Sequence, residues 1–256
     1  NEFRQIYRQD TASGDVTLLT DGGRSQNGGW VWNQAEDRIA YLSTRRNGAD
    51  RDVWLMDPLD QATDRLLVTL SGGGWSALDW SPDDAQILLG EYLSVTRSHL
   101  WMVDVATATK TKLNDDAEEV SYAGGRFSAD GSGFFVTTDK GSEFKRLAFW
   151  NLATNQLELL TEQIPWDVEE FDLSDDGQSI CFITNEAGIS RAYVMDTATR
   201  QYRPVEGLPS GVVSGGRWHE NGREVAFSIS SARATLDVYT WEAPTGKVER
   251  WTESED

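Results

Sequence analysis

The sequence predicts an all-β fold made of repeated four-stranded antiparallel units, and three observations carry this prediction. One hairpin pattern occurs five times, a second occurs six times, and both repeat with a period of about 46 residues. Apolar and aromatic residues alternate with polar ones in short runs, and no segment has the periodicity of a helix. A repeat of this length with four strands is typical of a β-propeller blade, so we expect a β-propeller.

The first pattern consists of an apolar strand, a polar turn and a second apolar strand. The residues that open its turns are separated by 48, 47, 46 and 45 residues. Gly131, Gly177 and Gly222 close three of the turns, where a positive φ is needed, and Asp84 takes that place in a fourth. We expect inner hairpins within residues 30–44, 78–92, 125–139, 171–185 and 216–230.

The second pattern is an aromatic or apolar pair, an acidic or amide residue, a polar turn and a strand that ends near threonine. Its acidic or amide residues are separated by 47, 47, 47, 45 and 46 residues. An inner and an outer hairpin together make one unit of four strands. We expect outer hairpins within residues 6–20, 53–69, 100–113, 147–161, 192–205 and 238–252.

The two patterns do not occur equally often, which predicts five full blades plus the outer half of another. A closed ring needs both halves of each blade, so we expect this chain to be a piece of a longer protein, cut inside a blade. The unpaired strand edge of the half blade also favours a homodimer formed through that edge. The expected blade units are approximately 1–24 (partial), 25–71, 72–118, 119–164, 165–208 and 209–256.

The composition excludes two classes of partner. Lysine and arginine number 23 against 42 aspartate and glutamate residues, and the resulting net charge of −19 is spread along the chain. Such a surface repels nucleic acid and anionic lipid, and no apolar run is long enough to span a membrane. We therefore expect neither a nucleic-acid nor a membrane partner. Cys181, the single cysteine, lies in an apolar run, which predicts a buried thiol without catalytic function.

The motifs of common enzyme classes are missing from the sequence. It contains no G-x-S-x-G, H-E-x-x-H, phosphate-binding loop or dinucleotide-binding glycine motif. His99 and His219 occupy repeat positions, and the adjacent carboxylates at 118–119 and 169–170 point to opposite faces of extended chain. No acidic turn matches a calcium-binding loop. We expect no catalytic residue, no metal and no cofactor in this chain.

Function is therefore expected on the loops that a rigid frame presents. The connections between second and third strands are long and varied, and they should share one rim with the segments 72–76, 164–170 and 209–216 that lead into the innermost strands. A solvated loop residue is the alternative reading of each candidate there. The candidate binding residues are Arg45, Arg46, Trp75, Glu91, Tyr92, Glu143, Trp166 and Asp167.

Several short segments carry a resemblance to a known family. They are "NEF" at 2–4, "LLTDGG" at 18–23, "SALDWSPD" at 76–83, "SEF" at 142–144, "PWD" at 165–167, "TNEAGISR" at 184–191 and "RWTESE" at 250–255. With them the sequence resembles, over essentially its whole length, the propeller domain of bacterial prolyl-oligopeptidase-family serine peptidases, especially the acylaminoacyl-peptidase-like branch. The last segment looks like the junction before the α/β-hydrolase domain of these enzymes.

The resemblance implies a non-catalytic domain. In this family the propeller is usually seven-bladed, covers the active site of the hydrolase domain and admits short peptides. Its partners would be the C-terminal α/β-hydrolase domain of the same parent chain and short peptide substrates. The family's catalytic triad lies in the hydrolase domain, and no position here matches it. The chain departs from the family by lacking at least one whole N-terminal blade and the inner half of its first blade.

Two other functions stay open from the sequence. One is a free-standing, TolB-like protein-interaction propeller. The other is a propeller enzyme such as a lyase or glycan hydrolase, which ranks last because the expected channel-side strands are rich in Gly, Ser, Ala and Val. The compartment is left open between bacterial cytoplasm and periplasm, with the cytoplasm favoured.

Overall fold

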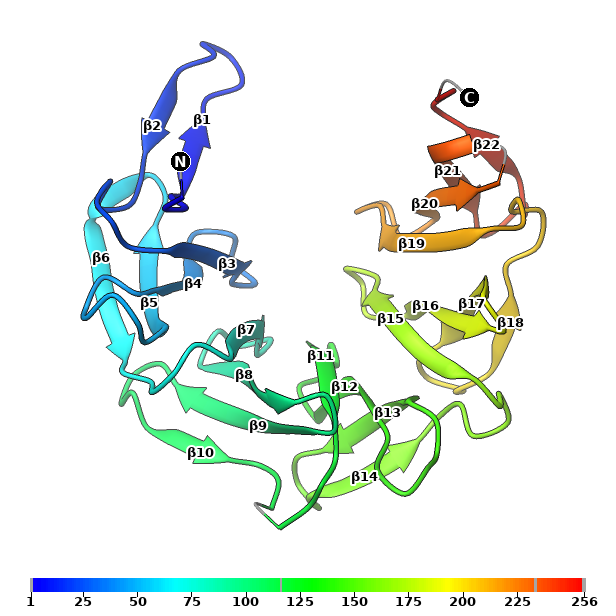
Figure 1. Ribbon diagram of the computed structural model, residues 1–256, viewed down its shortest axis with the longest axis horizontal. Coiled ribbons are helices and arrows are strands. Elements are labelled where there is room, and N and C mark those ends of the chain that lie inside the picture. Colours follow the sequence, from blue (N-terminus) through cyan, green and yellow to red (C-terminus); the bar gives the residue numbers. More distant parts are fainter. Residues whose placement is uncertain (1, 116, 233, 255–256) are drawn as a thin grey trace. The chain divides into compact units, whose positions relative to one another are not determined.

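A computed structural model describes residues 2–115, 117–232 and 234–254. The chain divides into two compact units, Asn1–Gly131 and Ser132–Asp256. Figure 1 shows strands joined by turns and loops throughout the described residues. No helix that is long and apolar enough to cross a membrane occurs within the described residues.

The first unit begins with a two-stranded sheet of β1 (Tyr7–Gln9) and β2 (Val16–Leu18). The first complete sheet contains β3 (Asn27–Trp32), β4 (Ile39–Ser43), β5 (Asp52–Asp57) and β6 (Asp60–Val68). The second contains β7 (Trp75–Trp80), β8 (Gln86–Ser94), β9 (Arg97–Asp104) and β10 (Lys110–Lys112). Strand β11 (Tyr122–Phe127) follows.

The second unit continues with β12 (Gly133–Thr138), β13 (Arg146–Asn151) and β14 (Gln156–Leu159), and the sheet order is β11-β12-β13-β14. The fourth complete sheet contains β15 (Asp167–Leu173), β16 (Ser179–Glu186), β17 (Ile189–Asp196) and β18 (Tyr202–Pro204). The fifth contains β19 (Val212–Trp218), β20 (Glu224–Ser231), β21 (Ala234–Glu242) and β22 (Val248–Arg250).

The prediction of an all-β chain with five four-stranded antiparallel sheets and one outer hairpin is confirmed. Within each sheet the strands follow one another in sequence order. They lie inside the ranges expected for the blade units, whose boundaries stay predictions. Strand lengths vary: β6, β8 and β9 have nine, nine and eight residues, whereas β10, β18 and β22 have three. The short outermost strands β10, β18 and β22 limit the open edge that their sheets present.

The inner hairpins turn as the sequence predicts. Gly131, Gly177 and Gly222 have φ values of 68°, 67° and 64°, and Asp84 has 58°. Glu36 occupies the equivalent place in the first complete sheet, with φ of 53°. A positive φ is strained for residues other than glycine, so Asp84 and Glu36 are held there by the rest of the turn.

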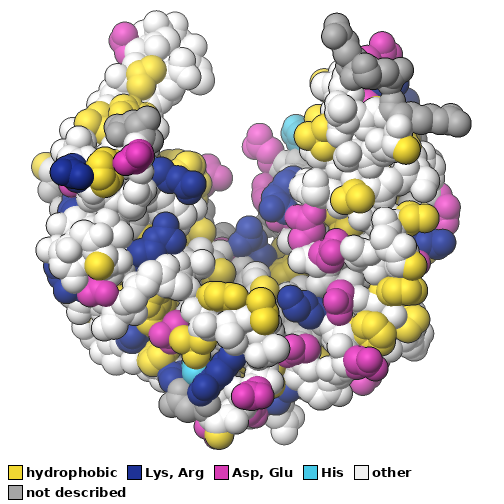
Figure 2. Space-filling view, in the orientation of Figure 1, with side chains coloured by type: hydrophobic (Ala, Val, Ile, Leu, Met, Phe, Trp, Pro, Cys, Tyr) yellow, Lys and Arg dark blue, Asp and Glu magenta, His cyan; other side chains and the backbone are white. Residues whose placement is uncertain are grey.

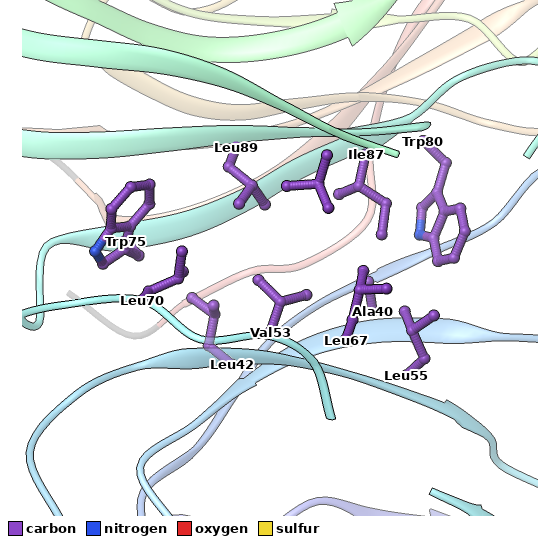
Figure 3. Packing of buried hydrophobic residues seen from close by; sticks show 11 residues of the cluster. Ala40, Leu42, Val53, Leu55, Leu67, Leu70, Trp75, Trp80, Ile87 and Leu89 are labelled. Atoms are coloured by element: carbon purple, nitrogen blue, oxygen red, sulfur yellow. The ribbon is translucent and has the colours of Figure 1, made fainter. Parts of the chain in front are cut away.

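Neighbouring sheets within the first unit pack face to face through apolar side chains (Figure 3). Leu42, Val53 and Leu55 of the first complete sheet form one buried cluster with Trp80 and Leu89 of the second. The Trp80 indole N–H also donates to the carbonyl of Val31 in the first sheet (3.2 Å). Each sheet therefore buries the face of its neighbour, as blades of a propeller do.

The second unit has a comparable cluster, in which Cys181 and Ile183 of the fourth sheet meet Val213 and Phe227 of the fifth. A Cβ atom on Gly216 would lie only 3.3 Å from the Cys181 sulfur, so the sheets approach closely there. Cys181 is buried, as predicted. Burial, reinforced by nearby carboxylates, raises the pKa of its thiol far above the usual value.

Candidate functional site

In each unit, the connection that leads into a first strand lies beside the start of the preceding sheet's third strand. The Arg51 amide donates to the Gly72 carbonyl in the first unit (3.1 Å), and the Ser190 amide donates to Gly211 in the second (3.0 Å). We call these connections and the adjoining strand ends the rim of each unit. It comprises residues 44–51, 69–75 and 91–98 in the first unit, and 139–145, 160–167, 187–190, 205–212, 231–232 and 234–236 in the second.

Arg45 is held by its own sheet rather than presented to solvent. Its guanidinium forms an ion pair with Asp64 (2.5 Å) and lies 4.0 Å from the centre of the Trp54 ring. It also donates to the Tyr41 hydroxyl, which itself donates to Asp64. This closed set of contacts gives Arg45 a structural role.

Arg46 fastens two rim segments together. Its Nε donates to buried Asp52 (2.7 Å), while Nη2 donates to Asp50 (2.9 Å) and to the Leu70 carbonyl (3.1 Å). Asp50 also accepts the Gly72 amide (2.7 Å), and this bond, ahead of those from Asn47 and Arg46, lowers the pKa of Asp50. The hydrogen bond to Asp52 raises the pKa of Arg46. The loop 44–51 is thus tied to the connection 69–74.

Trp75 and Glu91 lie opposite each other on β7 and β8 and belong to one compact cluster. Glu91 accepts the Trp101 indole N–H (2.9 Å), and the Lys110 ammonium lies 4.5 and 4.2 Å from the Trp75 and Trp101 ring centres. Burial lowers the pKa of Lys110, while the charge of Glu91 opposes that shift. Lys110 already covers these rings, so an incoming cation would have to displace it.

Tyr92 belongs to an exposed apolar tip where β8 turns into β9. Its side chain is 58% exposed, and those of Leu93 and Val95 are 46% and 76% exposed. The Tyr92 amide bonds to the Gly74 carbonyl (2.8 Å), which fixes the base of the tip to the rim. Three exposed apolar side chains on one rigid hairpin are unusual for a solvated loop and favour contact with another surface.

The three second-unit candidates differ in their surroundings. Glu143 is exposed in the connection between β12 and β13. Asp167 is exposed, and its carboxylate accepts the Lys145 amide (2.7 Å). Trp166 is half-buried and packs on the core cluster that contains Ile164. Glu143 and Asp167 are thus the accessible charges among them.

The second unit also presents apolar side chains at its rim. Ile189 is exposed where β16 turns into β17, and Val212 is exposed at the start of β19. Leu236 is exposed near the start of β21. The residue pattern alone does not separate these positions from ordinary strand residues, so sequence reasoning missed them along with Leu93 and Val95.

The remaining titratable candidates have structural surroundings. His99 is buried on β9, and the His219 Nδ1 atom accepts the Asn221 amide inside its turn (3.0 Å). Glu169 accepts from the Asn185 side chain, whereas Glu170 accepts the Gly215 amide (2.8 Å). Within the described residues, no three His, Cys, Asp or Glu side chains gather as they would around a metal ion.

The charges on the face drawn in Figure 2 are mixed. Acidic side chains are scattered over both units, with basic and uncharged side chains between them. The net charge of −19 is therefore a property of many dispersed carboxylates rather than of one acidic cleft on that face.

A pocket of about 380 Å³ in the first unit lies away from all eight candidates. Tyr7, Trp30, Trp32, Ile39 and Leu59 supply its apolar lining, and Glu36 stands among its charged residues. We call this pocket the first-blade groove. The unequal numbers of inner and outer hairpins were the sequence signal that could have located it.

Comparison of the sequence with protein-family models and with curated proteins finds no match. Solved structures do match. TolB from Acinetobacter baumannii has a TM-score of 0.70 at 16% identity, over 98% of this chain and 60% of that one. A puromycin-hydrolyzing peptidase of Mycobacterium tuberculosis has 0.77 at 14% identity, over 96% and 41%. An oligogalacturonate lyase from Vibrio parahaemolyticus has 0.76 at 13% identity, over 97% and 71%.

These similarities define the class of the protein as a β-propeller. The fold is shared with propeller domains of peptidases, with TolB and with lyases, at identities too low to assign a sequence family. This chain spans less than two thirds of the TolB chain and less than half of the peptidase chain.

Proposed function

We propose that this chain is the larger part of the propeller domain of a serine oligopeptidase, where it packs on an α/β-hydrolase domain and gates access to the active site. The observation that carries the proposal is the match to the puromycin-hydrolyzing peptidase. That match takes in 96% of this chain and leaves more than half of the peptidase chain unmatched. The resemblance at 76–83, 165–167 and 250–255 points to the same class.

The exposed apolar rim supplies a surface for the hydrolase domain. In the first unit it is the tip formed by Tyr92, Leu93 and Val95. In the second unit Ile189 and Leu236 have the same kind of position, close to the turn between second and third strands. Burial of such side chains under another domain would stabilise the pair by about 25 cal/mol per Å² of apolar surface.

The charge of the domain favours a class of substrate. A propeller with a net charge of −19 attracts cationic peptides and repels anionic ones at low ionic strength. Exposed Glu143 and Asp167 lie on the second-unit rim. Short peptides with a basic residue or a free N-terminal amine are therefore the substrates that this domain would admit best.

The first experiment is to sequence the gene on both sides of this chain. A downstream G-x-S-x-G in an extension of about 250 residues is expected, since a hydrolase domain of that size must follow. The purified chain should not hydrolyse a short aminoacyl or peptidyl substrate by itself. A gene that ends soon after Asp256, or hydrolysis by the chain alone, would contradict the proposal.

A second experiment tests the apolar tip in the full-length enzyme. Leu93→Ser combined with Val95→Ser should loosen the contact between the domains and raise hydrolysis of a large, unfolded protein relative to a short peptide. Val16→Ser is the matched control, because Val16 is 62% exposed on the outer strand β2 and lies outside both the rim and the first-blade groove. Equal substrate ratios for the double variant, the control and the unaltered enzyme would refute the assigned contact.

The TolB-like interaction propeller is the second candidate function. It is favoured by the match to TolB, of which this chain covers a larger share than it does of the peptidase. In that case the rim would bind a protein partner without any hydrolase domain. A gene that encodes no hydrolase-length extension would select this function, and the double rim variant would then reduce partner binding instead of changing hydrolysis.

A further inference from the structure

The first-blade groove is open to solvent, whereas the equivalent surfaces at Trp80 of the second sheet and at Phe127 of β11 are covered. Trp32 comes directly before its turn, in the place that Trp80 has in the second sheet and Phe127 has on β11. Trp32 is 48% exposed, whereas Trp80 and Phe127 are 0% and 4% exposed. The difference lies in the neighbour, because Trp80 packs on Ala40 and Leu55 of the preceding sheet (Figure 3).

The turns show the same relation. Asp84 closes its turn and accepts three hydrogen bonds from the turn of the preceding sheet: the Gln34 amide (2.7 Å), the Ala35 amide (3.2 Å) and the Asn33 side chain (2.8 Å). Glu36 holds the equivalent position one sheet earlier and lines the groove. Its carboxylate is thus placed where a preceding turn would present its amides.

The strand beside the groove has an open edge. In the complete sheets of the first unit, the third strand pairs with the second strand on one side and with the fourth on the other, as β9 does with β8 and β10. β1 is the counterpart of a third strand, and within the described residues it pairs with β2 alone. The hairpin itself is anchored, since Ile6 and Leu19 are buried with Ile39, Tyr41 and Met56.

We propose that the first-blade groove binds an inner β-hairpin supplied by the segment that precedes Asn1 in the natural protein. In all five complete sheets the second strand comes directly before the third in sequence, so this segment has the right connectivity. Its second strand would add antiparallel to β1. The turn would offer backbone amides to Glu36, and the sheet would cover Trp30 and Trp32.

The repeats also specify the chemistry of the bound hairpin. Its second strand is an apolar run, because β4 and β12 are buried at all their residues. A carboxylate two residues before its turn would accept the Trp32 amide, as Asp79 accepts the Phe127 amide (2.8 Å). A second copy of this chain is a poorer occupant, since its inner hairpins are committed to their own sheets. None of these contacts depends on the proposed peptidase function.

The test compares residues 1–256 with a version extended upstream by one repeat period, about 46 residues. Acrylamide quenching of Trp32 is measured as the difference between each protein and its Trp32→Phe variant. Trp32 should be readily quenched in the shorter chain and lose most of that quenching in the longer one. Trp251→Phe is the control, because Trp251 is 66% exposed in the second unit and should be quenched equally in both.

A second variant reads the turn contact. In the longer chain, Glu36→Gln should raise the equilibrium constant for unfolding about fivefold, because a charged hydrogen-bond acceptor is lost. In the shorter chain it should leave that constant unchanged. Glu249→Gln on the outer strand β22 is the control and should change neither chain.

Three results would overturn the proposal. One is a gene without an inner-hairpin pattern in the upstream 46 residues. Another is Trp32 quenching that is the same in the longer chain as in the shorter. The third is protection of Trp32 in the shorter chain that rises with protein concentration and does not change on extension, which would make a second copy the occupant.

Discussion

Asp84 is the residue whose replacement tests most directly how the sheets hold one another. Its carboxylate accepts the Gln34 amide, the Ala35 amide and the Asn33 side chain across the boundary between two sheets, at 2.7, 3.2 and 2.8 Å. It does so from a backbone with φ of 58°. Two energies are therefore combined at one residue: hydrogen bonds to a charged group and the strain of a positive φ.

Two substitutions separate these energies. Hydrogen bonds to a charged group contribute about 1.5–3 kcal/mol each when buried. Asp84 is half-buried, so in the variant water can replace much of the hydrogen bonding that its carboxylate provided. We therefore expect Asp84→Gly to cost about 2 kcal/mol in total. Glycine relieves the positive φ but gains freedom in the unfolded chain, and these effects roughly cancel. Asp84→Ala should cost about the same in total, because alanine has the positive-φ penalty that aspartate already has and gains no freedom in the unfolded chain; the difference between the two variants therefore reports the backbone effects alone.

Urea unfolding followed by tryptophan fluorescence measures both changes. Glu36 provides the matched control, since it has the same turn position with φ of 53° but faces the open first-blade groove. Glu36→Gly and Glu36→Ala should both be close to neutral, because alanine meets the same positive-φ penalty that glutamate already has. The reasoning is refuted if Asp84→Gly is no more costly than Glu36→Gly.

Three further predictions concern buried and titrating groups. Asp52→Ala should cost about 3 kcal/mol in the same urea assay, because it removes a buried carboxylate that binds Arg46 and the Leu70 amide; Asp50→Ala, at a more exposed carboxylate, should cost clearly less, and the reverse order would contradict the structure. Cys181 should not react with a thiol reagent at pH 8 until the protein is unfolded, and since burial raises its folded pKa, stability should fall above about pH 9, where only the unfolded thiol ionises. Asp104 and Asp196 should titrate below the usual aspartate pKa in NMR, because the amide and hydroxyl of Thr107 and Thr199 bond to them; their contribution to stability is complete above about pH 4 and is lost as the pH falls through the lowered pKa, so normal values would refute these turn contacts.

Much of the fold could be predicted because it is written locally and then repeated. A turn such as Ser174–Gly177 needs only its own residues to reverse the chain, and its φ at Gly177 follows from the residue type. Cys181 in an apolar run is buried for an equally local reason. Repetition then makes each local signal more reliable, since five copies with the same spacing rarely arise by chance.

The candidate site was less predictable from the sequence. Arg45 and Trp75 looked like loop residues available to a ligand, but each is engaged by side chains from other strands, Trp54 and Asp64 in one case and Lys110 in the other. Local composition does not encode those contacts. The exposed apolar tip at Val95 was missed because an apolar residue in a strand pattern is ordinarily buried.

The sequence by itself determined the repeat, the strand order within each sheet, the turn geometry and the unequal count of inner and outer hairpins. These depend on alternation and on backbone preferences, which act over a few residues. Only the tertiary structure decided which side chains stay accessible: it buried Trp80 under the preceding sheet and left Trp32 open. The physical reason is that exposure depends on whether a neighbouring sheet is present to pack against, and Trp32 and Trp80 hold equivalent places in the repeat but differ in that respect.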